Sequence, residues 1–297
     1  ATAGQAKRVF QWPAFHYFRV GRTKMRFHGG DDILAIADSA YYLAPISEID
    51  RARKYPYHAP SGGFVLSNGD LFHLDESHLS HNHKDGILAG RTAVLSVGSN
   101  RAPVQLLRKF GMNATVPVTP ARLHDCDIVH AAILGYYAAV PCTAFPSSGT
   151  IVQLNVAWLD DDQLIQMHRT EGIGVAYDFV EMQTVEHQFK LPIGSVFGYA
   201  ARAGVLDCGD GMPAGLAAIP VEGRRFTTLS QDQAATKLRQ LAKVDDDRTM
   251  SQFIAEMQAD KAARDAVIDR LRPFAIQPQN PPWQLQSVQI DGVDAYL

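Results

Sequence analysis

The chain has 297 residues, of which 46% are hydrophobic and 20% are charged, a composition typical of globular proteins with one large core or two smaller ones. Its formal net charge of −3 gives no overall basic field, so we expect neither nucleic acid nor a membrane as a partner. Residues 1–10 lack the apolar run of a secretory signal, and no stretch approaches the roughly 18 apolar residues of a membrane span, so we expect a soluble, cytoplasmic protein.

Residues 1–91 are expected to form an N-terminal segment of short strands and turns. This part of the chain is aromatic, rich in histidine and interrupted by pairs of glycines. The piece GGFVLSNGDLFHL predicts a β-hairpin, because two apolar runs flank Asn68-Gly69, a pair that tolerates the positive φ angles of a tight turn.

Residues 92–226 contain a mixture of strand and helix patterns, unlike the short strands and turns of the N-terminal segment, and predict a central α+β domain. A short apolar strand runs into the turn at Val97 to Asn100, and a helix with Pro103 in its first turn follows it and stops at Gly111. Further strands are predicted within ARLHDCDIVHAA, TIVQLNVAWL, YDFVEM and SVFGYAA. A helix over residues 160–172 is predicted between the second and the third of these strands.

Residues 227–297 predict a helical tail that ends in an extended, proline-rich strap. Ser230 is a candidate N-cap for a first helix, and residues 247–274 are expected to form one long, charged amphipathic helix ended by Pro273. Such a helix would serve either as a brace across the domain or as a homodimer contact.

Three segments, in order, resemble the gamma-glutamylcyclotransferase-like family. Ser96-Val97-Gly98-Ser99-Asn100 is similar to the family's YGSN loop, with Val97 in place of the tyrosine. Residues 141–172 resemble its stretch of turn, strand and helix ending in a Glu-Gly pair, and Tyr177 lies where family members carry a tyrosine. The resemblance covers residues of about 92–226 and implies a small mixed β-barrel with flanking helices.

The resemblance also implies a reaction, in which a γ-glutamyl amide cyclises to 5-oxoproline without a cofactor. Glu171 would be the general acid/base, with its pKa raised by an apolar pocket. Val97, Gly98, Ser99 and Asn100 would hold the substrate, since backbone N–H groups in such a turn stabilise developing negative charge. Tyr177 would hydrogen-bond the substrate or Glu171, and Arg122 or Arg101 would pair with the glutamyl carboxylate.

Simpler interpretations of the same residues stay open. Glu171 is also typical of a solvated carboxylate at a helix end, Gly98-Ser99-Asn100 of an ordinary strand-to-helix turn, and Tyr177 of a core aromatic. Cys142 lies near the proposed pocket, where a thiol with a neighbouring histidine would suggest acyl transfer, but we expect it to be a buried packing residue.

A second candidate site is the histidine-rich run over residues 73–85. Imidazole and carboxylate groups are the ligands of zinc and non-haem iron, and the run contains His73, Asp75, His78, His81 and His83. Its spacing fits no HExxH motif, so a polar surface loop is the favoured interpretation.

The sequence leaves three functions to be separated. The leading hypothesis is an enzyme that cyclises or cleaves a γ-glutamyl or similar small amide. The alternatives are a ligand-binding or interaction module on the same fold that has lost activity, and a metal-dependent enzyme that uses the histidine-rich run. The Val97 replacement leaves the identity of the substrate open.

Overall fold

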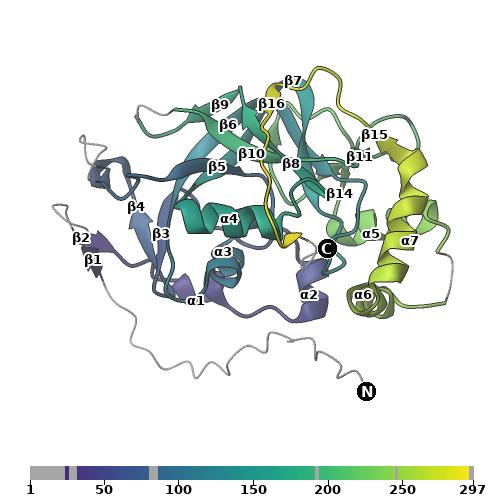
Figure 1. Cartoon of the computed structure of the whole chain (residues 1–297), viewed down its shortest axis with the longest axis horizontal. Coiled ribbons are helices and arrows are strands. Elements are labelled where there is room, and N and C mark those ends of the chain that lie inside the picture. Colours follow the sequence, from purple (N-terminus) through teal and green to yellow (C-terminus); the bar gives the residue numbers. More distant parts are fainter. Residues whose placement is uncertain (1–23, 27–31, 80–85, 191–193, 245–246, 294–297) are drawn as a thin grey trace.

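The computed structural model describes residues 24–26, 32–79, 86–190, 194–244 and 247–293. Among these residues most strands belong to one mixed sheet of twelve strands. The helices of the central segment pack against this sheet, and those of the C-terminal part lie together beside it (Figure 1). The helices are α1 (Ser39–Leu43), α2 (Glu48–Arg53), α3 (Pro103–Phe110), α4 (Asp161–Thr170), α5 (Gln231–Leu241), α6 (Met250–Ala259) and α7 (Lys261–Leu271), with short 3-10 turns η1 (Glu76–His78), η2 (Ser99–Arg101) and η3 (Arg272–Phe274).

The large sheet follows the order β14-β12-β6-β7-β5-β10-β8-β16, and β3, β4, β9 and β13 are attached beside this path. Its strands are β3 (Gly63–Ser67), β4 (Asp70–Leu74), β5 (Thr92–Ser96), β6 (Thr115–His130), β7 (Cys142–Leu159), β8 (Tyr177–Met182), β9 (Val185–His187), β10 (Val196–Ala201), β12 (Gly215–Leu216), β13 (Val221–Glu222), β14 (Thr228–Leu229) and β16 (Trp283–Leu285). Two small sheets pair β1 (Lys24–Arg26) with β2 (Asp32–Leu34), and β11 (Val205–Leu206) with β15 (Ala275–Ile276).

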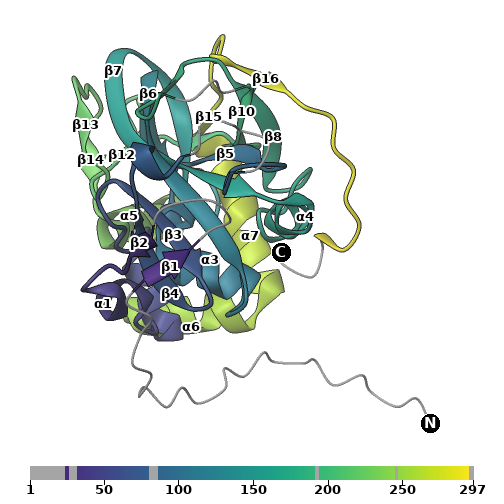
Figure 2. The same ribbon diagram turned by 90° about the vertical axis from the view of Figure 1, so that its left-hand side faces the viewer.

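The predicted α+β class is therefore confirmed, whereas the described strands form an open sheet instead of the small closed barrel that was expected. The reason lies in β6 and β7, which have 16 and 18 residues and are far longer than usual strands. They pair with each other along most of their length, bend at a bulge near Asp125, and carry additional strands at their ends. Figure 2 shows this curved pair rising away from α1 and α6.

The three predicted segments contribute to the same sheet. The predicted hairpin is confirmed: β3 and β4 pair around Asn68 and Gly69, whose φ angles are 50° and 76°, and β3 also pairs with β6. At the other end of the chain, β16 from the proline-rich strap pairs with β8. The sheet thus holds residues from 63 to 285 together.

The helices of the central segment follow the sequence pattern closely. Pro103 begins α3, and Gly111, with a φ angle of 82°, follows its last residue. Asp160 caps α4 by accepting a hydrogen bond of 2.9 Å from the Gln163 N–H. Both helices lie on one face of the sheet, where Leu106 and Met167 are fully buried (Figure 1).

The C-terminal part contains two helices where one long helix was expected. Asp260 separates α6 from α7: its backbone is extended, and its side chain accepts a 3.1 Å hydrogen bond from the Ala263 N–H. Aspartate favours such a cap over a helix interior, and this preference explains the break. The apolar sides of α5, α6 and α7 pack with one another and with residues 134–140 of the central segment.

Candidate functional site

The loop after β5 is shaped by a close approach of three chain segments. Gly98 lies against the side chains of Tyr55 and Cys142, and a Cβ at this position would overlap the Tyr55 hydroxyl and lie 2.9 Å from Cys142 Sγ. The Tyr55 hydroxyl is itself held 3.2 Å from that sulfur and accepts a 3.1 Å hydrogen bond from the Cys142 N–H. Glycine is required here because no side chain fits between these groups.

Glu171 lies at the end of α4 and faces the same loop. Its side chain is 17% exposed, and its Oε1 accepts a 3.0 Å hydrogen bond from Asn100 Nδ2. The two residues are 71 positions apart in the sequence, and the fold joins the loop to the helix end through this contact. Glu171 and the Val97–Asn100 loop, both candidate site residues from the sequence, are therefore in direct contact.

Lys109, which the sequence analysis did not identify, is the second partner of Glu171. Its Nζ donates to the same Oε1 and lies 3.2 Å from Met167 Sδ, and its side chain is only 5% exposed. The helical spacing could have indicated that Lys109 is buried, because it follows the fully buried Leu106 by three positions and so lies on the inward side of α3. The surroundings of Glu171 are thus charged, in contrast to the apolar pocket that was expected.

Buried hydroxyl and thiol groups surround this ion pair. The Tyr177 hydroxyl donates to the Cys142 carbonyl oxygen at 3.2 Å, and the Tyr199 hydroxyl lies 2.8 Å from His168 Nδ1. Burial raises the pKa of both tyrosines well above the usual range, and it raises the pKa of the Cys142 thiol to about 12. The buried Cys142 is therefore a protonated thiol at neutral pH, and a protonated thiol is a poor nucleophile.

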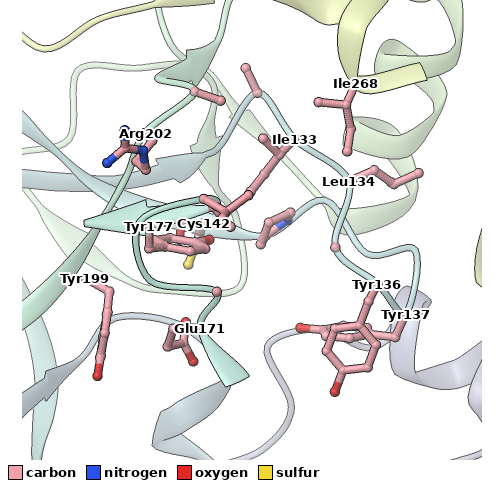
Figure 3. Close-up of a pocket in the computed structure, with 18 of the residues that line it drawn as sticks. Ile133, Leu134, Tyr136, Tyr137, Cys142, Glu171, Tyr177, Tyr199, Arg202 and Ile268 are labelled. Atoms are coloured by element: carbon pink, nitrogen blue, oxygen red, sulfur yellow. The ribbon is translucent and has the colours of Figure 1, made fainter. Parts of the chain in front are cut away.

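These groups line a cavity of about 1210 Å³. Figure 3 shows Glu171, Tyr177 and Tyr199 on one side of it, Tyr136 and Tyr137 on the other, and Ile268 of α7 beyond them. The cavity brings together most of the predicted site residues, which lie in separate parts of the chain: Val97, Gly98, Ser99, Asn100, Glu171 and Tyr177.

The two predicted arginines lie elsewhere. Arg122 is on β6, with Nη1 3.9 Å from Glu186 Oε1, and it does not line this cavity. The Nε of Arg101 donates to Asn155 Oδ1 at 3.2 Å, and this side chain is also outside the cavity lining. Neither arginine therefore lines the cavity beside Glu171.

The histidine-rich run is described only in part. His73 is exposed on β4, and His78 Nδ1 accepts a 3.0 Å hydrogen bond from the Asp75 N–H, which closes η1. His81 and His83 lie outside the described residues. Within the described ranges, no three His, Cys, Asp or Glu side chains are grouped to hold a metal ion.

Comparison with known proteins gave no assignment: no protein-family model, no curated protein and no solved structure matches this chain. Among the residues that the structure describes, no helix is long and apolar enough to cross a membrane.

Proposed function

We propose that this chain is an enzyme with a divergent cyclotransferase-like fold that cyclises a γ-glutamyl or similar small amide, with Glu171 as the general acid/base. The observation that carries the proposal is the hydrogen bond from Asn100 to Glu171, which joins the glycine-containing loop and the carboxylate in one cavity. Two features that the resemblance implies as parts of one site meet at hydrogen-bonding distance.

The reaction requires one proton acceptor and a folded substrate. The substrate's α-ammonium gives a proton to Glu171, and the freed amine attacks the γ-carbonyl carbon to form the five-membered ring. The C–N bond of the amide then breaks as Glu171 returns the proton to the departing nitrogen. The ring nitrogen still carries a second proton, which passes to Glu171 and from there to the released amine, so that the lactam is neutral and Glu171 is again a carboxylate. The products are 5-oxoproline and an amine or amino acid, and holding the ends of the substrate together supplies much of the acceleration.

The loop and the second oxygen of Glu171 fit these roles. Gly98, Ser99 and Asn100 precede or begin η2, and the first N–H groups of such a turn have no partners within it. They are donors for the oxygen on which negative charge develops. Both described contacts of Glu171 go to Oε1, so that Oε2 is left to accept the proton.

Lys109 has a supporting role in this proposal. The Lys109 ammonium contacts Glu171 Oε1 and places a positive charge beside the carboxylate. The contact also fixes the direction of the carboxylate, because both Asn100 and Lys109 bind the same oxygen.

The test is mass-spectrometric detection of 5-oxoproline after incubation with γ-glutamyl amino acids, peptides and amines. We expect product with the unmodified chain and a loss of about 10²- to 10⁴-fold in rate with Glu171→Gln. Glu222→Gln is the matched control, because Glu222 is an exposed carboxylate on β13 outside the cavity. Activity that survives Glu171→Gln would refute the assignment of the base.

A ligand-binding module without turnover is the second candidate, and the ion pair itself favours it. Both described contacts of Glu171, from the Lys109 ammonium and the Asn100 amide, are ones that a carboxylate holding a binding loop in place would also make. This candidate predicts that a γ-glutamyl compound raises the melting temperature while no 5-oxoproline forms. The two measurements on one sample separate the candidates.

A further inference from the structure

The far end of the cavity is built by α7 and has a different character from the Glu171 end. Residues of α7 and the segment after it line it, together with Arg202 from the turn after β10. Four basic side chains face two acidic ones there: Arg202, Lys261, Arg264 and Arg272 against Asp265 and Asp269. This end of the cavity therefore has an excess of positive charge.

Three of the four basic side chains are exposed and paired. Lys261 Nζ lies 2.7 Å from Asp265 Oδ2, Arg272 Nη2 lies 2.8 Å from Asp269 Oδ1, and Arg202 contacts Asp178. The exposed fractions of these basic side chains are 56%, 78% and 45%. Such pairs need no further anion, because water and the neighbouring aspartate already stabilise the charge.

Arg264 is different because it is buried and has no carboxylate partner. It is 5% exposed, and its Nη1 donates to the Met257 carbonyl oxygen at 2.6 Å, at the C-terminal end of α6. Among the described residues no carboxylate forms an ion pair with it within 4 Å, and the charges of Asp265 and Asp260 act on it only from a greater distance. Burial lowers the pKa of its guanidinium.

A buried guanidinium usually pairs with an anion. The carbonyl at the end of α6 satisfies one of five N–H donors and supplies only a partial negative charge. Planar guanidinium groups favour carboxylates, which they bind with two parallel hydrogen bonds. Arg264 lines the cavity, so an anion that enters the cavity can reach it.

We infer that the α7 end of the cavity is a subsite for a carboxylate on the departing part of the substrate, bound by Arg264. The inference rests on the proposed function, which places the γ-glutamyl part at Glu171. A cavity of about 1210 Å³ exceeds the space that a single small ligand needs and leaves room for a second group. The substrate class is then γ-glutamyl amino acids or short peptides with a free carboxylate, in preference to γ-glutamyl amines that depart as cations.

The experiment compares two pairs of compounds that differ only in the terminal group. N-glutarylglycine and N-glutarylglycinamide lack the α-amine and cannot cyclise, so calorimetry measures their binding alone. γ-Glutamylglycine and γ-glutamylglycinamide are the corresponding substrates for turnover. We expect the carboxylate ligand to bind about ten- to a hundredfold more tightly than the amide, as is typical for a charge-assisted pair.

The variants assign that preference to one residue. Arg264→Gln should remove the difference between the two ligands, and Arg264→Lys should restore part of it by keeping the charge. Arg270→Gln is the matched control: Arg270 is also on α7 and also donates to a helix-end carbonyl, that of Ala242 at 3.3 Å, but it does not line the cavity. The unmodified chain alone already tests the preference, should a variant fail to fold.

The outcomes separate the inference from the proposed function. Preference for N-glutarylglycine without turnover of either substrate would refute the proposed enzyme and keep the subsite. Turnover of both substrates with equal KM would keep the enzyme and overturn the subsite. Equal binding of the two ligands, no measurable binding of N-glutarylglycine, or a preference that survives Arg264→Gln would also overturn it.

Discussion

The two ends of the cavity differ in how tightly their side chains are packed. At the Glu171 end, strand termini and helix ends press together, so that Gly98 has no room for a side chain and a single carboxylate oxygen carries two contacts. At the α7 end, most charged side chains are exposed and paired along one helix. Tight packing fixes the side chains at the Glu171 end. At the α7 end, the exposed charged side chains can be substituted with little effect on the free energy of unfolding. We therefore expect substitutions at the Glu171 end to lower the free energy of unfolding more than substitutions of the exposed residues at the α7 end.

The largest effect is expected from Gly98→Ala. The added methyl group would overlap the Tyr55 hydroxyl and crowd Cys142, and overpacking of this kind lowers the free energy of unfolding by about 3 kcal/mol. Chemical denaturation measures the change. Tyr55→Phe removes the overlapping oxygen, so the double variant should recover part of the loss. A loss below about 1 kcal/mol in the single variant would show that the loop shifts easily.

Lys109→Met should have the next largest effect. It leaves Glu171 half-buried without its cation, and we expect a loss of about 2 kcal/mol in the free energy of unfolding. Adding Glu171→Gln removes the unpaired charge and should recover most of that loss. Lys261→Met at the other end breaks an exposed pair, and we expect a change below about 0.5 kcal/mol. Equal losses in the free energy of unfolding from Lys109→Met and Lys261→Met would contradict the proposed difference between the two ends of the cavity.

Acidification should act on the Glu171 end through His168. Burial lowers the pKa of this imidazole to about 4, against about 6.5 in an unfolded chain. Between these values the unfolded state binds one more proton, so the free energy of unfolding falls as the pH falls, by about 1 kcal/mol from pH 7 to pH 5. His168→Gln should flatten this dependence in denaturant titrations at the two pH values. The pKa of His187 is also lowered to about 4, so part of the slope should remain.

The local elements could be predicted because their causes are local. Asn68-Gly69 specifies its hairpin, Pro103 and Gly111 bound α3, and Ser230 caps α5 with a 3.3 Å hydrogen bond from the Gln233 N–H. Glu171 and the Val97–Asn100 loop were also found from the sequence, since the resemblance follows the order of short segments. Each of these features depends on a few neighbouring residues.

The remaining features depend on contacts between distant parts of the chain. Lys109 becomes part of the site only because α3 packs beside α4, and Arg264 only because α7 reaches a cavity formed by residues of the central segment. The open sheet was missed for the same reason, since the strands attached to β6 come from residues 63–67, 185–187 and 215–216. Spacing in the sequence holds no direct information about such neighbours.

The position of β5 has a consequence for synthesis of the chain. This strand has β7 on one side and β10 on the other, and β10 is completed roughly 100 residues after β5. At ribosomal rates of about 5–20 residues per second, the backbone N–H and C=O groups of β5 that face β10 remain without their partner for several seconds. A nascent chain thus presents an apolar strand with an unpaired edge until β10 is synthesised.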